Sequence, residues 1–156
     1  MASMKLTDLI QPGLVISDLE PIDKFEALRA MAERLASKTA KISAEDLFQR
    51  IVEREKLSST GIGSGIAIPH ARLDGIEEHA IVFARSHRGI HYDAIDDRPV
   101  HLIFMIVGPT TANETHLKAL ARISKFLHDT SFREQLLIAQ SGEEIHEAIR
   151  KKDAQY

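Results

Sequence analysis

The apolar run from Val100 to Val107 constrains the fold more than any other segment, because it reads Val-His-Leu-Ile-Phe-Met-Ile-Val. Apolar residues at nearly every position, rather than at every second one, are typical of a central strand that is buried on both faces. Gly108 and Pro109 then stop the strand, since proline has no N–H group to offer a sheet. A strand buried on both faces needs a layer of helices on each side, so this run predicts an α/β fold.

Several helix starts can be placed from the sequence. One helix is predicted after Pro21, and three more begin where a serine precedes an acidic residue by three positions, at Ser43, Ser131 and Ser141. The helix after Ser43 is expected to end near residues 54–56. Each of the first two helices has an apolar face, made of Phe25, Leu28, Ala32 and Leu35 in one, and of Leu47, Phe48, Ile51 and Val52 in the other.

Strands alternate with these helices. They are predicted at residues 66–68 and 80–86 as well as in the central run, and a further helix is predicted over residues 113–129. Residues 89–98 are expected to form a loop or an edge hairpin. Together the elements predict a single α/β domain over residues 1–156, with a central mixed sheet flanked by helices on both faces.

Composition excludes several classes of function. The formal net charge of −3 argues against binding to nucleic acid or acidic membranes, and the absence of cysteine excludes disulfides, thiolate catalysis and Cys-ligated zinc. No apolar stretch approaches the ~20 residues that cross a bilayer, and no signal peptide begins the chain, so a cytoplasmic protein is expected. Residues 1–4 are interpreted as a disordered end, in which Met1-Ala2-Ser3 is an added remnant or an alternative start.

The segment Gly61–His70 is a candidate site, and it reads Gly-Ile-Gly-Ser-Gly-Ile-Ala-Ile-Pro-His. Its glycines permit close backbone approach, and its apolar residues predict a short buried strand that Pro69 ends. His70 is therefore expected at a strand end, where α/β folds bind ligands. A neutral imidazole can act as a nucleophile, a base or a metal ligand, although the local sequence fits a structural histidine equally well.

Other motifs are incomplete around this segment. It lacks the last glycine of a dinucleotide-binding fingerprint, the lysine of a P-loop and the glycines of a nucleophile elbow. Two histidines without a third ligand make a poor zinc site. The sequence therefore predicts neither a metal nor a cofactor.

His116 is the second candidate. It begins a helical stripe that continues with Leu120, Ile123 and Leu127, so its side chain is expected to face inward. Local sequence favours a core histidine here. The alternative is a role in binding an anion. His116 lies near a helix N-terminus, where free N–H groups and the helix dipole favour an anion. His101 lies inside the central strand and is interpreted as structural, and the other histidines, His79 among them, stand in polar contexts that assign no partner.

These segments resemble a known family, the fructose/mannitol-type enzyme IIA of the bacterial phosphoenolpyruvate:sugar phosphotransferase system, which includes the nitrogen-regulatory enzyme IIA. The resemblance extends over nearly the whole chain, from Leu6 to Ile149. The motifs that carry it are, in order along the chain, Arg54-Glu55, Ser59-Thr60-Gly61-Ile62-Gly63, Ala67-Ile68-Pro69-His70-Ala71-Arg72 and His116-Leu117.

The resemblance implies a phosphohistidine relay that needs no metal and no cofactor. It implies that Nε2 of His70 accepts a phosphoryl group and that His116 hydrogen-bonds the phosphoryl oxygens. It also implies that Arg54 adds positive charge and that the Thr60 hydroxyl donates a hydrogen bond. From local sequence alone, Arg54 is a solvated residue at a helix C-terminus, and Arg72 is expected to be solvated as well.

The implied partners are the histidine phosphocarrier protein as donor, and an enzyme IIB or a regulated target protein as acceptor or partner. They are expected to dock on an apolar rim of Ile62, Ile66 and Leu73. A chain that ends at Tyr156 without an attached IIB or membrane domain favours the standalone regulatory type over a sugar-transport component. Two alternatives belong to other classes: a binding module that is never phosphorylated, and a small hydrolase with His70 as its base, against which the lack of a carboxylate in the glycine-rich motif argues.

Overall fold

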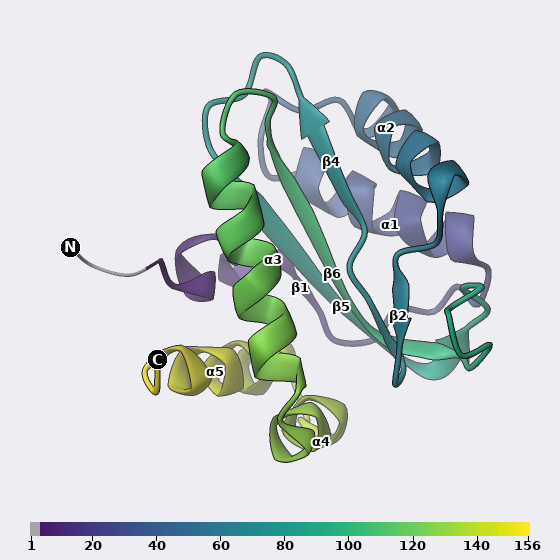
Figure 1. Ribbon diagram of the computed structural model, residues 1–156, viewed down its shortest axis with the longest axis vertical. Helices are drawn as coiled ribbons and strands as arrows, with labels where there is room; N and C mark the ends of the chain where they lie inside the picture. Colours follow the sequence, from purple (N-terminus) through teal and green to yellow (C-terminus); the bar gives the residue numbers. More distant parts are fainter. Residues whose placement is uncertain (1–3) are drawn as a thin grey trace.

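The computed structural model describes residues 4–156, which are built around one mixed sheet (Figure 1). Its strands are β1 (Val15–Ile16), β2 (Gly61–Gly63), β3 (Ile66–Ala67), β4 (His70–Leu73), β5 (Ala80–Ile90) and β6 (Val100–Pro109). The order across the sheet is β1–β5–β6–β3–β2, and β4 also pairs with β6. β6 runs antiparallel to β5 but parallel to β3 and β4, so the sheet is mixed, as the sequence predicts.

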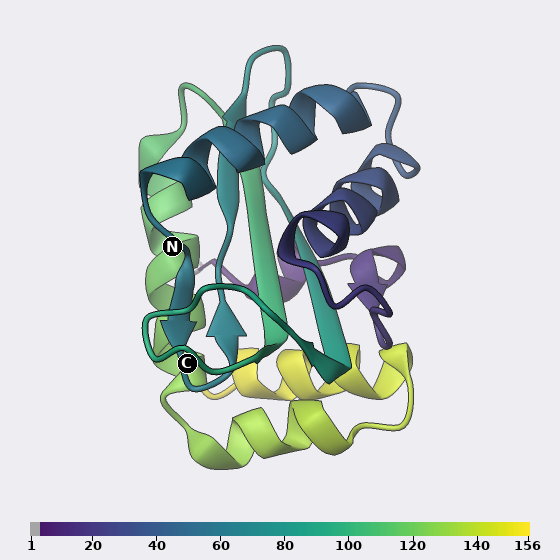
Figure 2. The same ribbon diagram turned by 90° about the vertical axis from the view of Figure 1, so that its right-hand side faces the viewer.

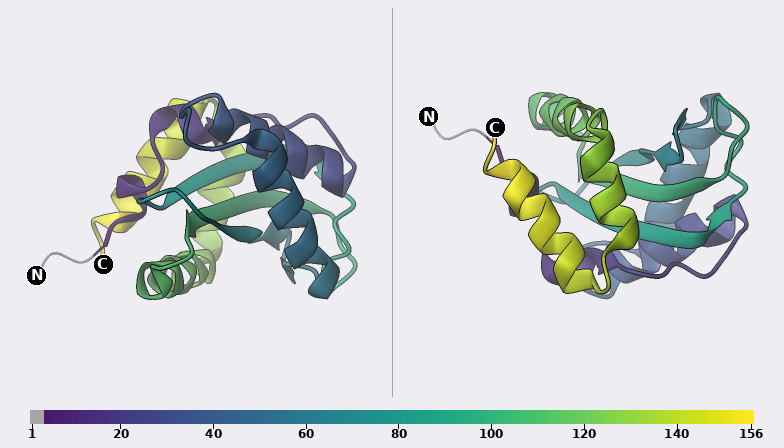
Figure 3. Two further views of the ribbon diagram at one scale, coloured as in Figure 1. Left: turned by 90° about the horizontal axis from the view of Figure 1, so that it is seen from above. Right: turned by 90° about the horizontal axis from the view of Figure 1, so that it is seen from below.

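Helices cover both faces of the sheet, which confirms the predicted architecture. They are α1 (Lys24–Ala36), α2 (Ala44–Leu57), α3 (Asn113–Leu127), α4 (Thr130–Ile138) and α5 (Gly142–Asp153). Figure 2 shows α1 and α2 in front of the sheet and α3 behind it, and the two views in Figure 3 show the same layers from above and below. Two short 3-10 turns, Leu6–Asp8 and Pro12–Leu14, precede β1.

β6 supplies side chains to both cores, which explains its continuous apolar sequence. Ile103, Met105 and Val107 belong to the core beneath α1 and α2. Leu102, Phe104 and Ile106 belong to the core beneath α3, α4 and α5. Because successive side chains of a strand point to opposite faces, every position of this strand except the half-buried His101 is buried by one layer or the other.

The predicted short strand does end before Pro69, at Ala67, but the pairing with β6 resumes at His70, which the sequence did not predict. Ala67 pairs with Ile103, and His70 pairs with Ile106, so β3 and β4 follow β6 as one strand with an interruption. Pro69 has no N–H group, but its carbonyl oxygen still accepts a hydrogen bond from the backbone N–H of Ile106, with an N–O distance of 2.9 Å. His70 is therefore the first residue of a second strand segment, rather than a residue beyond the strand.

The glycine-rich turn is a hairpin between β2 and β3. Ser64 (φ +57°) and Gly65 (φ +78°) occupy its two central positions. Positive φ at both positions is the geometry of a tight two-residue hairpin turn, and glycine adopts it at little cost. At Gly61 a Cβ atom would lie 2.8 Å from the backbone of Ala94, so the motif also needs its first glycine for close packing.

Most predicted helix starts are confirmed. The hydroxyl of Ser43 accepts from the N–H of Asp46, and the hydroxyl of Ser141 caps α5 in the same way. The predicted start at Ser131 is wrong: the carboxylate of Asp129 caps α4, two residues earlier. Phe25 does not join the apolar face of α1 and is largely exposed, whereas the other three predicted residues are buried.

The ends of several elements differ by a few residues from the prediction. β5 continues to Ile90, four residues further than expected, and the following residues form a loop before β6. Residues 1–3 lie outside the described residues, and with them most of the predicted disordered end, while Met4 packs against the core beneath α3. Within residues 4–156, no helix is long and apolar enough to span a membrane.

Candidate active site

The residues that the sequence singles out meet in a cleft between α2, β4 and α3, which lie side by side in Figure 1. The cleft has a volume of about 510 Å³. Arg54 reaches it from the last turn of α2, His70 and Arg72 from β4, and His116 from α3. The structure therefore brings together three of the four site residues that the family resemblance implies.

The ring of His70 is oriented by a hydrogen bond to its own backbone segment. Nδ1 of His70 lies 3.1 Å from the carbonyl oxygen of Ile68, which can only accept, so Nδ1 carries the proton. Nε2 of His70 is then left with a lone pair. Burial lowers the pKa of His70, and the positive charges of Arg54 and Arg72 lower it further, so the ring is neutral at pH 7. A neutral imidazole with a free Nε2 lone pair is a nucleophile.

Arg54 lies directly against that lone pair. Its Nε–H donates to Nε2 of His70 at 3.1 Å, and its Nη1 donates to the carbonyl oxygen of Ser58 at 3.0 Å. The second bond holds the guanidinium at the C-terminal end of α2, where the helix dipole favours a positive charge. A guanidinium in this position can also bind an anion attached to Nε2.

His116 stands on the other side of His70. The ring centroids are 5.1 Å apart, and the planes meet at 67°. The side chain belongs to the first turns of α3, and the residue is buried, as the helical stripe predicts. Burial lowers the pKa of His116 to about 4, with further contributions from His70, Arg72 and His79, so this ring is also neutral at pH 7.

The surrounding charge of the cleft is positive. Arg50, Arg54 and Arg72 line it, and Glu53 is the one acidic residue of its lining. α3 begins without a side-chain cap, so the backbone N–H groups of its first turn keep the capacity to bind an anion. The cleft therefore combines two neutral histidines, one of them with a nucleophilic nitrogen, with several arginines. Such a site is better suited to bind a negatively charged phosphoryl group than a cation.

Comparison with known families agrees with this geometry. Residues 8–152 match the family model described as "Phosphoenolpyruvate-dependent sugar phosphotransferase system, EIIA 2". The chain belongs to this family. The match covers nearly every described element of the EIIA domain, including α2, β4 and α3, which form the cleft.

Relatives of this EIIA domain include both sugar-specific and nitrogen regulatory proteins. The chain is 39% identical over 151 residues to the fructose-specific EIIABC component of Bacillus subtilis, covering 96% of this chain but only 24% of that protein. It is 34% identical over 146 residues to the nitrogen regulatory protein of Bradyrhizobium diazoefficiens, covering 94% and 95% of the two chains. The crystal structure of nitrogen regulatory protein IIA-Ntr from Neisseria meningitidis superimposes with a TM-score of 0.87 at 30% identity, over 92% of this chain and 98% of that one.

The fourth implied residue, Thr60, is engaged elsewhere in this EIIA domain. Its backbone N–H donates to Oε1 of Glu55 at 3.0 Å, its hydroxyl donates to Oε2 of the same carboxylate, and the phenol of Tyr92 lies 3.0 Å from that hydroxyl. Thr60 is buried and does not line the cleft. In this structure its hydroxyl holds the loop after α2 in place, whereas the family resemblance implies a hydrogen bond to the phosphoryl group.

Two residues of the site escaped the sequence reasoning. Arg72 was expected to be solvated, but it is half-buried and lines the cleft. It stands two residues after His70 on the same strand, so the alternation of a strand places both on one face, once β4 is recognised as a strand. His79 was assigned no partner, yet its ring centroid lies 6.0 Å from that of His116. Only the fold could reveal this, because the two are far apart in the chain.

The apolar rim around the cleft is made of residues other than those expected. Ile66 (3% exposed) and Leu73 are buried in the cores, because β3 and β4 turn these side chains inward. Ile62 is half exposed but does not line the cleft. Leu57 at the end of α2 and Leu117 on α3 both line the cleft and are 82% and 62% exposed. The exposed apolar surface beside His70 therefore comes from the two helices.

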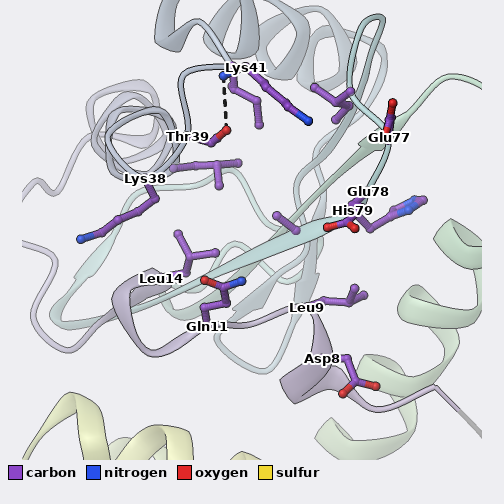
Figure 4. Close-up of a pocket in the computed structure, with 14 residues that line it drawn as sticks. Asp8, Leu9, Gln11, Leu14, Lys38, Thr39, Lys41, Glu77, Glu78 and His79 are labelled. Atoms are coloured by element: carbon purple, nitrogen blue, oxygen red, sulfur yellow. Dashed lines mark hydrogen bonds between the residues drawn. The ribbon is translucent and has the colours of Figure 1, made fainter.

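A second cavity lies apart from this cleft. It has a volume of about 300 Å³ and is bordered by the N-terminal turns, the loop after α1 and the segment before β5 (Figure 4). His79 borders it, but its imidazole ring points away from the cavity in Figure 4. None of the four site residues implied by the family resemblance lines this cavity.

Proposed function

We propose that this chain is a phosphoryl carrier whose His70 accepts a phosphoryl group from the histidine phosphocarrier protein. Nε2 of His70 attacks phosphorus, a new N–P bond forms, and the N–P bond of the donor phosphohistidine breaks. The electron pair of the broken bond returns to the donor imidazole, and the proton on Nδ1 of His70 stays in its bond to the Ile68 carbonyl. The observation that carries the proposal is this tautomer, which leaves Nε2 as the lone-pair nitrogen beside Arg54.

The site accelerates the transfer by positioning the phosphoryl group in line with Nε2 and by stabilising its negative charge, because phosphoryl transfer needs little covalent participation from the protein. During attack the Nε–H of Arg54 leaves the Nε2 lone pair and turns to a phosphoryl oxygen. Arg72 adds a second positive charge from the same face of β4, and His116 donates a hydrogen bond from the opposite side. Preorganised donors of this kind stabilise the transferring group without first having to expel water.

We further propose the regulatory role for the phosphoryl group. The nitrogen regulatory relatives support it, with identities of 34% and 37% over 94% and 95% of this chain. Phosphorylation adds a doubly charged group between the exposed side chains of Leu57 and Leu117, which weakens docking of any partner that buries this apolar surface. The unphosphorylated form is then the one that binds its target.

The sugar-transport role is the second candidate, and one observation favours it. The 39% identity to the fructose-specific EIIABC component exceeds the identity to the nitrogen regulatory proteins. In that role His70 passes the phosphoryl group to an enzyme IIB.

One experiment separates these outcomes. The protein is incubated with phosphoenolpyruvate, enzyme I and the phosphocarrier protein, and the phosphoryl group is followed by intact mass. We expect one phosphoryl group on the wild type and none on His70→Ala. Subsequent transfer to a fructose-type enzyme IIB at a rate comparable to loading favours transport. Retention of the phosphoryl group on this protein favours regulation. If the wild type is not phosphorylated at all, the result supports a binding module that carries no phosphoryl group.

A further inference from the structure

Two buried nitrogen atoms in the site have no hydrogen-bond partner. They are Nδ1 of His116 and Nε2 of His79, and among the described residues no other buried side-chain nitrogen or oxygen is left in this state. A buried polar atom without a partner costs about 1–3 kcal/mol, so such atoms are rare unless they serve a purpose. Here both belong to neighbouring rings, with centroids 6.0 Å apart and planes tilted by 47°.

The ring of His79 is held in place by the sheet. A Cβ atom on Gly108 would lie 2.2 Å from both Cδ2 and Nε2 of His79, so the imidazole packs directly on the backbone of β6. Only glycine leaves room for a ring at this position. His79 therefore stands beside His116 as a fixed ring and does not itself line the cleft that both His116 and His70 line.

The two nitrogens are not hydrogen-bonded to each other in this structure, although their rings are neighbours. We propose that a small rotation of the His116 ring lets Nε2–H of His79 donate to Nδ1 of His116, and so fixes His116 in the tautomer that carries its proton on Nε2. This inference rests on the proposed function, in which His116 must donate to a phosphoryl oxygen. One hydrogen bond satisfies both buried nitrogens at once. His79 is thus a positioning residue that acts through His116.

The groups that face His116 support this direction of the bond. They are His70 and Arg72 on β4, and His79 before β5, and none is a carboxylate. No carbonyl or carboxylate oxygen reaches Nδ1 of His116, so nothing holds a proton on that nitrogen. Burial lowers the pKa of His79, with a further contribution from Arg72, and both rings are neutral at pH 7.

The site would then contain two histidines in opposite tautomers. In each ring, the hydrogen-bond partner of Nδ1 decides whether Nε2 carries the proton. The Ile68 carbonyl keeps the proton of His70 on Nδ1, which makes Nε2 the nucleophile. His79 keeps the proton of His116 on Nε2, which makes that nitrogen a donor. Without His79, an acceptor lone pair on Nε2 of His116 would face the incoming phosphoryl oxygens in part of the molecules.

The direct test is long-range ¹H–¹⁵N NMR of the histidine rings in the unphosphorylated wild-type protein at pH 7. We expect His116 to carry its proton on Nε2 and His79 to carry its own on Nε2. A proton on Nδ1 of His116 overturns the proposal. Because this measurement involves no phosphoryl group, it stands even if His70 proves not to be phosphorylated.

Variants supply the kinetic test. In His79→Leu we expect mixed tautomers of His116 and loading of His70 slowed about tenfold, the scale of one lost hydrogen bond. His79→Gln, whose amide can donate, should restore the rate, and His87→Leu, an exposed site on β5, should leave it unchanged. Equal slowing in the Leu and Gln variants would mean that His79 matters only for packing, and an unaffected rate in His79→Leu would also refute the proposal.

Discussion

Replacing Glu55 by Gln should destabilise the fold strongly, because it removes the charge from a buried ion pair. Nζ of Lys24 lies 2.9 Å from Oε1 of Glu55, and the two side chains are 8% and 0% exposed. Glu55 also accepts both hydrogen bonds of Thr60, and the Lys24 ammonium lies 4.5 Å from the ring centroid of Tyr92. In Glu55→Gln the ammonium stays buried without a counter-charge.

The size of the effect follows from that burial. Breaking a buried pair by removing one charge costs about 3–5 kcal/mol, whereas an exposed pair contributes about 1 kcal/mol or less. In a chain of this length, each kcal/mol shifts the melting temperature by about 2–4 °C, so a drop of roughly 6–20 °C is expected. The double variant Lys24→Met/Glu55→Gln should recover more than half of the loss, because no unpaired charge remains.

Urea unfolding followed by circular dichroism measures these free energies. Glu114→Gln is the matched control, since Glu114 pairs with Lys118 at 3.0 Å on the exposed surface of α3. It should change the free energy of unfolding by less than about 1 kcal/mol. If Glu55→Gln unfolds within about 1 kcal/mol of the wild type, the buried pair does not hold the loop between α2 and β2 as argued.

Three further predictions concern the cleft. Arg54→Gln should fold normally but slow the loading of His70 by ~10²–10³, measured by rapid quench, and a near-normal rate would return Arg54 to a structural role. Leu117→Ser should raise the KM for the phosphocarrier protein with little change in kcat; an unchanged KM would place docking elsewhere. Folding lowers the pKa of His116 from about 6.5 to about 4, so the folded state binds fewer protons and stability falls as the pH decreases through this window. Between pH 7 and pH 5 the wild type should therefore lose about 2 kcal/mol more unfolding free energy than His116→Gln, and equal losses would contradict the assignment.

The fold could be predicted from the sequence wherever a residue pattern is compatible with only one kind of local structure. The apolar run of β6 implies burial on both faces, and Ser43 and Ser141 mark helix starts with their own side chains. The start of α4 was misplaced because Asp129 competes with Ser131 as a cap, and the sequence does not rank them. The strand after Pro69 was missed because proline usually ends a strand, whereas here the Pro69 carbonyl still accepts from the N–H of Ile106 and pairing with β6 resumes at His70.

The site was predictable only in part. His70 stands out in the glycine-rich segment, whereas Arg54 and His116 are singled out only by the family resemblance, and the cleft confirms that the three lie together. The location of Thr60 could not be foreseen, because its partners Glu55 and Tyr92 come from a buried network that forms only in the folded chain. His79 depends in the same way on the close approach that Gly108 permits.

The central claim is that Nε2 of His70 is the phosphoryl acceptor, and ³¹P and ¹⁵N NMR of protein loaded from the phosphocarrier protein tests it most directly. We expect one acid-labile, base-stable phosphoryl group, with its P–N coupling to Nε2 of His70 and with the proton of Nδ1 retained against the Ile68 carbonyl. A phosphoryl group on Nδ1, on His116 or His79, or on any residue of the His70→Ala variant would contradict it.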